Sequence, residues 1–130
     1  MNILGLGFDA TDIPRVRATF DRYGERFLRR IFTEGEIAYC TRRRDPVPSL
    51  AARFAAKEAA IKVLRPGDEG VPWREIEVRR DPAGWVALEL TGRAAALAVE
   101  AGVRELAVSL SHEEGLACAV VIAEIPTSDR

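Results

Sequence analysis

Apolar residues form a short strand and then recur with helical spacing over the first third of the chain. A strand is predicted over residues 3–8, which puts Asp9 at its exit. Asp12 followed by Pro14 is typical of a helix start. The helical apolar stripe beyond it continues to Ile31 in two segments, so two short helices are expected after the strand.

Two capping signals mark the next helices. Residues 33–36 read Thr-Glu-Gly-Glu, which matches a capping box and predicts a helix to about Arg42. After a proline-containing loop, Ser49 is expected to cap the longest helix, residues 50–64. That helix is rich in alanine, so it has high intrinsic propensity and permits close packing.

The second half of the chain has the alternation of antiparallel hairpins. Four strands are predicted, over residues 75–80, 85–90, 106–111 and 116–123. An alanine-rich helix from Thr91 to about Gly102 separates the two hairpins. Helices and hairpins together predict a single α+β domain over residues 1–130, with antiparallel hairpins packed on a long helix and a frayed tail after Pro126.

Composition narrows the class of protein. The chain of 130 residues is 48% hydrophobic and 30% charged, which fits one compact domain. No apolar run approaches the roughly 20 residues of a membrane span and the N-terminus lacks a basic leader, so a cytoplasmic protein is expected. Cys40, Cys118 and the single His112 cannot form a zinc site, which leaves oxygen ligands and a hard cation such as magnesium. A large ligand would need a surface cleft or a subunit interface.

The formal net charge of −1 conceals an asymmetry. Arginine is concentrated in the first third of the chain, and acidic residues predominate in the second half. The basic part could attract an acidic protein, a phosphorylated cofactor or nucleic acid, or it could be a solvated surface. Nucleic acid is disfavoured because aromatic residues do not alternate with the basic ones.

Four charged residues of the long helix are candidates for chemistry. Glu58 follows Phe54 by four residues and therefore lies on or beside the inward face; alternatively it pairs with Lys62 at i, i+4. Arg53 and Lys57 have the same spacing. The four charged residues are expected to form one polar band suited to phosphate.

Asp9 and Glu58, from different elements, suit magnesium on phosphate oxygens, because magnesium prefers few carboxylates plus substrate and water. Asp9 could instead be a loop or cap residue. His112, in phase with Leu110 near a strand end, is either structural or directed at a ligand.

Taken together, four segments in this order resemble the holo-acyl-carrier-protein synthases, which are 4'-phosphopantetheinyl transferases. The segments are residues 5–9 with Arg15, residues 32–36, residues 53–59 with Lys62, and residues 108–112. The resemblance extends over residues 3–123. Phe8 and Ala10 depart from the usual pattern but leave the acidic position unchanged.

The resemblance implies transfer of phosphopantetheine from coenzyme A to a serine of an apo acyl carrier protein, with release of adenosine 3',5'-bisphosphate. The carrier could serve fatty acid or polyketide synthesis. In the family pattern Asp9 and Glu58 hold Mg²⁺ and Lys62 contacts a phosphate. The remaining nucleotide and phosphate region is lined by Arg53, Lys57 and His112.

Glu58, directly or through a metal-bound water, is the preferred base for the serine proton. The resemblance also implies a homotrimer with sites between protomers. The carrier's acidic helix is expected to dock on Arg15, with Arg17, Arg22 and Arg26 beside it.

Two other functions stay open from the residues alone. One is a non-catalytic oligomeric binding module whose basic face takes an acidic protein. The other is a different coenzyme A enzyme such as an acyltransferase, although no glycine-rich phosphate loop precedes a helix. Product analysis separates these possibilities.

Overall fold

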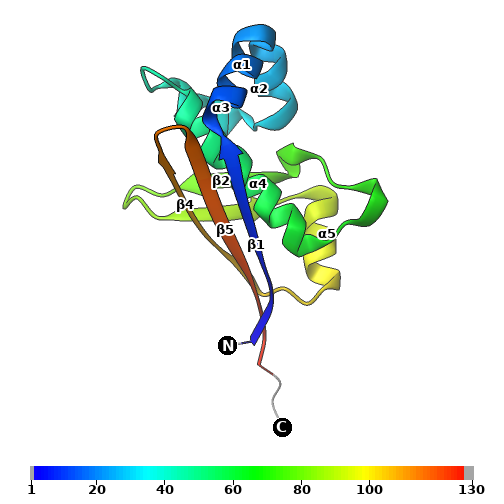
Figure 1. The fold of residues 1–130 in the computed structure, drawn as a ribbon. Helices are drawn as coiled ribbons and strands as arrows, with labels where there is room; N and C mark the ends of the chain where they lie inside the picture. The colour runs from blue at the N-terminus through cyan, green and yellow to red at the C-terminus, as the bar shows by residue number, and fades with distance from the viewer. Residues whose placement is uncertain (1, 128–130) are drawn as a thin grey trace.

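The computed structural model describes residues 2–127, which form two antiparallel sheets around a central helix (Figure 1). The elements in chain order are β1 (Asn2–Asp12), α1 (Ile13–Tyr23), α2 (Glu25–Ile31), α3 (Glu34–Thr41), α4 (Val47–Leu64), the short 3-10 turns η1 (Gly67–Glu69) and η2 (Trp73–Glu75), β2 (Ile76–Arg80), β3 (Val86–Leu90), α5 (Gly92–Glu100), β4 (Glu105–Glu113) and β5 (Leu116–Ile125). The expected α+β class is confirmed.

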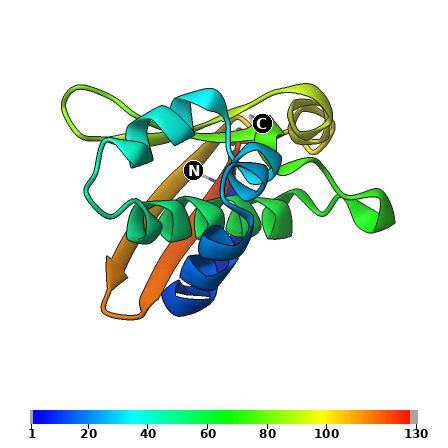
Figure 2. The ribbon, with the colours of Figure 1, turned by 90° about the horizontal axis from the view of Figure 1, so that it is seen from above.

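The long helix α4 lies between the larger sheet and the rest of the molecule. The strand order is β1-β5-β4 in the larger sheet and β2-β3 in the smaller. Figure 2 shows α4 crossing the strands of the larger sheet, with α1 on one side and the β2–β3 hairpin on the other. Alanines of α4 pack on alanines and Val121 of β5, and this contact forms the main core. Small side chains on both elements allow the backbones to approach closely.

Strand β1 presents its small and polar residues to α4. Gly7 and Thr11 are buried on this face and Asp9 is half-buried, whereas Leu6 and Phe8 are 62% and 53% exposed on the other face. A strand has a side-chain period of two, so one face takes every second residue. The large apolar residues of β1 are therefore turned away from the core.

Gly7 lies directly against the backbone of α4. A Cβ atom at this position would overlap the carbonyl oxygen of Ala59. We therefore expect Gly7→Ala to lower the free energy of unfolding by about 3 kcal/mol, as overpacking of a rigid contact does. Urea denaturation measures the change. Gly5→Ala is the matched control, because the nearest atom to a Cβ there is Arg65 Nη2 at 4.0 Å; equal losses in both variants would contradict the packing argument.

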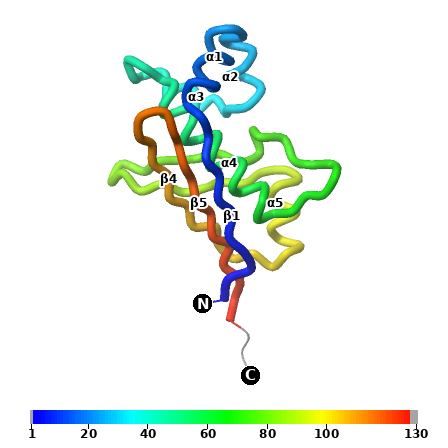
Figure 3. The backbone as a smooth tube through the Cα atoms, in the orientation of Figure 1, coloured from blue at the N-terminus to red at the C-terminus, as the bar shows by residue number. Residues whose placement is uncertain are grey.

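Several expected boundaries were wrong. The strands predicted over residues 106–111 and 116–123 extend over Glu105–Glu113 and Leu116–Ile125, and two further differences concern β1 and α4. β1 continues to Asp12 because its pairing with β5, which runs beside it in Figure 3, extends to Leu116. Asp9 therefore lies within the strand, opposite Ala119. α4 begins at Val47, and Ser49 does not cap it. Proline fits the first turn of a helix, so Pro48 lies in the first turn of α4 instead of extending the loop.

The other local signals are confirmed. The Asp12 side chain accepts the Arg15 backbone N–H at 3.2 Å, and the capping box of Thr33 and Glu36 is formed in both directions. Gly24 separates α1 from α2 with a φ of 53°. The expected fraying past Pro126 falls largely on residues 128–130, which lie outside the described residues. Within residues 2–127 no helix has the length and apolarity of a membrane span.

Candidate active site

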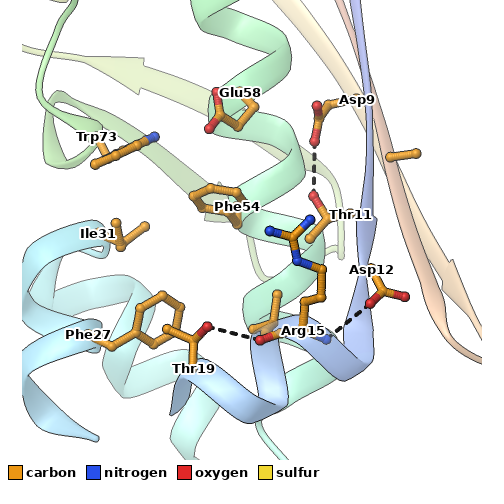
Figure 4. A pocket seen from close by; sticks show the side chains of 12 residues that line it. Asp9, Thr11, Asp12, Arg15, Thr19, Phe27, Ile31, Phe54, Glu58 and Trp73 are labelled. Carbon is orange, nitrogen blue, oxygen red and sulfur yellow. Dashed lines mark hydrogen bonds between the residues drawn. The ribbon is translucent and has the colours of Figure 1, made fainter. Parts of the chain in front are cut away.

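A cavity of about 410 Å³ opens between the C-terminal part of β1, the helices α1, α2 and α4, and the η2 turn (Figure 4). One wall is polar, with Asp9 and Asp12 from the strand and Arg15 from α1. Phe54 of α4 and Trp73 of η2 form part of the apolar wall. Glu58 lines the same cavity, one turn beyond Phe54. The fold thus brings the two expected metal-binding carboxylates to one cavity.

Asp9 is held on two sides. Thr11 Oγ1 donates to Asp9 Oδ2 at 2.9 Å, and Lys62 Nζ donates to Asp9 Oδ1 at 3.1 Å and to the Phe8 carbonyl oxygen at 2.6 Å. Lys62 is therefore turned to β1, and the alternative Glu58–Lys62 pair is not formed. The Lys62 side chain is 54% exposed, so this ion pair contributes little to stability and leaves the ammonium accessible.

Glu58 has no cationic partner in direct contact among the described residues. Burial raises the pKa of its carboxyl above the usual value, and the negative charge of Asp9 raises it further. The Trp73 indole and the Lys62 ammonium act in the opposite direction. Two carboxylates that repel each other across a cavity suit a hard cation, which would relieve the repulsion.

The expected polar band along α4 was wrong, because its members lie on different faces of the helix. Lys57 is fully buried, and its Nζ lies 2.7 Å from Glu36 Oε1 and donates to the carbonyl oxygens of Trp73 and Ile76. Burial lowers the pKa of Lys57, and the charge of Glu36 opposes this shift. All three donors of the ammonium are engaged, so the expected contact of Lys57 with a phosphate does not fit this position.

Glu36 is a structural residue that the sequence reasoning assigned only to a helix cap. Its Oε1 accepts from the Thr33 N–H at 2.9 Å and its Oε2 from the Val78 N–H at 2.7 Å, in addition to the ion pair with Lys57. A buried charge requires such partners, since an unpaired one is very costly. In the sequence, the only indication of a buried acidic partner was Lys57, a lysine on the buried face of the long helix.

A second cavity, of about 310 Å³, lies where α3 and α4 meet the β2–β3 hairpin. Four arginines line it, namely Arg42, Arg53, Arg79 and Arg80. Arg53 is 2% exposed, donates to Ser49 Oγ at 2.9 Å and stacks 4.2 Å from the centre of the Tyr39 ring. Burial alone would raise the pKa of Tyr39, but the hydrogen bond from Arg43 and the charges of Arg80, Arg43 and Arg53 lower it. This cavity suits an anion. Of its four arginines, the sequence assigned only Arg53 to the phosphate region and placed Arg42 in the general basic part of the chain.

The remaining candidates lie on the surface. His112 is exposed near the end of β4, opposite Ala117, and lines neither of these two cavities. Arg15 reaches the first cavity, whereas Arg22 and Arg26 lie exposed on α1 and α2. Within residues 2–127 none of these three arginines forms an ion pair, in contrast to Arg17, which binds Asp45 at 2.6 Å.

An α+β chain with two carboxylates at one cavity, a lysine paired with one of them, and clustered arginines at another cavity is typical of a protein that binds a large phosphorylated ligand. The family model described as ACPS, the 4'-phosphopantetheinyl transferase superfamily, matches residues 5–121. The chain therefore belongs to this superfamily, as the resemblance implied.

Individual relatives agree over nearly the whole chain. A holo-[acyl-carrier-protein] synthase from Koribacter versatilis is 45% identical over 123 residues, covering 94% of this chain and 98% of the relative. A crystal structure of the synthase from Neisseria meningitidis is 34% identical and superimposes with a TM-score of 0.84, over 95% of this chain and 99% of that one. An ACPS–CoA complex from Chronobacterium ammoniagenes is 31% identical with a TM-score of 0.85, over 98% and 100% of the two chains.

Proposed function

We propose that this protein transfers 4'-phosphopantetheine from coenzyme A to a serine of an apo acyl carrier protein and releases adenosine 3',5'-bisphosphate. The observation that carries the proposal is that Asp9 and Glu58 line one cavity, with Lys62 bound to Asp9 beside it, in a member of this superfamily. The names of the relatives and the coenzyme A bound in one of them support it.

Asp9 and Glu58 would hold Mg²⁺ in the loaded enzyme. Within residues 2–127 no three His, Cys, Asp or Glu side chains gather into a metal site. Two carboxylates nevertheless fit magnesium, which takes its other ligands from water and from phosphate oxygens. When bound, magnesium would offset the negative charge of the coenzyme A pyrophosphate.

The chain's own residues supply the remaining functions. The exposed ammonium of Lys62 is free to exchange the Phe8 carbonyl for a phosphate oxygen. Glu58 accepts the proton of the serine hydroxyl, because its carboxylate lines the cavity and no cation of the described residues is in contact with it. Arg53 and its neighbours in the arginine-lined cavity bind the phosphates of the nucleotide, with His112 as a further contact.

We also propose a homotrimer with sites between protomers. Cross-strand pairs on the outer face of the larger sheet join Leu6 to Ile122 and Phe8 to Val120. Such an exposed apolar sheet face is typical of an interface, and further copies of this chain are the occupant we propose. The acidic and the arginine-lined cavities lie on different sides of α4, so a shared site would let two copies contribute different groups.

The proposed trimer can be tested by introducing a charged side chain on the outer face of the larger sheet. Leu6→Glu is expected to reduce the trimer mass measured by light scattering to that of a monomer, because burying an unpaired carboxylate is unfavourable. Val99→Glu is the matched control, since Val99 is 77% exposed on α5, away from the sheet face. A monomeric, fully active wild-type protein would refute the shared site.

One assay tests the proposed reaction and its alternatives. The protein is incubated with coenzyme A, magnesium and an apo carrier protein, and the carrier mass and the nucleotide product are measured. We expect a carrier bearing phosphopantetheine together with adenosine 3',5'-bisphosphate. In a parallel reaction with an acyl-coenzyme A, release of free coenzyme A instead of the bisphosphate would indicate acyl transfer. An unmodified but stably bound carrier would indicate a binding module. A cytoplasmic location stays a prediction.

A further inference from the structure

The Trp73 side chain covers the acidic cavity beside Glu58. Its ring packs on Phe54, with centroids 6.1 Å apart and planes tilted by 40°. The indole Nε1 is buried and has no hydrogen-bond partner in the described part of the chain. Figure 4 shows the nitrogen edge of the indole turned toward the Glu58 carboxylate, while Asp9 and Arg15 lie on the opposite wall. A buried donor without an acceptor is unfavourable, and Glu58 is the acceptor on its side of the cavity.

The backbone of Trp73 is fixed from the other side of α4. Lys57, the residue before Glu58, donates from Nζ to the Trp73 carbonyl oxygen at 3.0 Å and also to the Ile76 carbonyl. The ammonium is itself held by the buried Glu36 carboxylate. One turn of α4 therefore sets the position of Glu58 and, through Lys57, the position of the η2 turn that carries Trp73.

We propose that Trp73 is a positioning residue whose indole N–H donates a hydrogen bond to one Glu58 carboxylate oxygen and so directs the other oxygen across the cavity toward Asp9. The buried pair of Lys57 and Glu36 holds the η2 turn in the register that this contact needs. The effect of this orientation on catalysis rests on the proposed function, whereas the hydrogen bond between Trp73 and Glu58 does not depend on it.

The hydrogen bond can be tested without coenzyme A, metal or carrier. The chain has two tryptophans, so a ¹⁵N-labelled sample gives two indole N–H signals, and Trp85→Phe assigns them. Trp85 is 77% exposed and serves as an internal reference. We expect the Trp73 signal downfield of the Trp85 signal and slow to exchange with solvent.

Substitution of the acceptor gives the decisive comparison. Glu58→Gln weakens a charge-assisted bond and should move the Trp73 signal upfield; Glu58→Ala should also speed its exchange. Neither change should move the Trp85 signal, and Glu100→Gln on α5 should move neither signal. A Trp73 signal unchanged in both Glu58 variants would overturn the proposal.

The positioning role is tested by Trp73→Phe, which keeps a ring against Phe54 and removes the N–H. We expect kcat to fall about tenfold with KM for coenzyme A and carrier unchanged, a size consistent with one hydrogen bond to a charged group. Trp85→Phe should leave kcat unchanged. An unchanged kcat in Trp73→Phe, or a rise in KM alone, would overturn the positioning role. If the wild-type protein transfers no phosphopantetheine, the proposed function is refuted. The indole N–H signals would still show whether Trp73 donates a hydrogen bond to Glu58.

Discussion

Asp9→Ala and Glu58→Ala are each expected to lower phosphopantetheine transfer by a factor of about a hundred or more. Each removes one of two carboxylates at the cavity, and a bound metal supplies several kcal/mol of charge stabilisation. Glu58→Ala also removes the proposed base. Initial rates at saturating coenzyme A and carrier, measured by the mass of the carrier, give the loss.

Folding should survive both substitutions. Asp9 is joined to an exposed lysine and Glu58 has no ion pair in contact among the described residues, so neither supports the core. Circular dichroism and the denaturation midpoint check this. Glu100→Ala on α5 is the matched control and should retain full activity. Near-normal turnover in a folded Asp9 or Glu58 variant would remove that residue from the proposed metal site.

Arg15→Glu is expected to lower kcat/KM for the carrier protein about a hundredfold while coenzyme A binding changes little. Arg15 is exposed, lines the acidic cavity and forms no ion pair within residues 2–127. A reversed charge there opposes the acidic surface of the carrier, and such juxtaposed like charges cost several kcal/mol and slow association. Added salt should weaken the wild-type encounter.

Steady-state kinetics with varied carrier and calorimetry with coenzyme A separate the two effects. Arg104→Glu is the control, because Arg104 directly precedes β4, whose first residues lie at the far end of the molecule from α1 (Figure 1). The Arg104 side chain is exposed, and its ion pair with Glu124 is long, at 3.9 Å. Equal losses in both measurements would place Arg15 in the nucleotide site. No loss in either would show that the carrier docks elsewhere.

Features decided by neighbouring residues could be predicted from the sequence. Asp12 and the pair of Thr33 and Glu36 cap helices through hydrogen bonds to amides within three residues, so the local sequence contains both partners. The hairpins and the α+β class follow from periodicity and turn residues in the same way. The family was recognisable because its motifs are short segments in a particular order.

The position of Asp9 and the orientation of β1 depended on a distant strand. The ladder with β5, more than a hundred residues further along the chain, extends β1 past Asp9. It also turns Gly7 and Asp9 to α4 and leaves Leu6 and Phe8 outside. An apolar strand does not by itself specify which of its two faces packs on the core, because the residues of either face could be buried there.

By itself, therefore, the sequence determined the local elements, the fold class, the family and the identity of the acidic pair. Only the tertiary structure decided which charges are available for chemistry. Lys57 and Glu58 are adjacent in the chain, yet Lys57 is buried in an ion pair with Glu36 whereas Glu58 lines a cavity. Successive helix residues point in directions about 100° apart, so their surroundings are set by whichever elements pack on each side, and those elements come from remote parts of the chain.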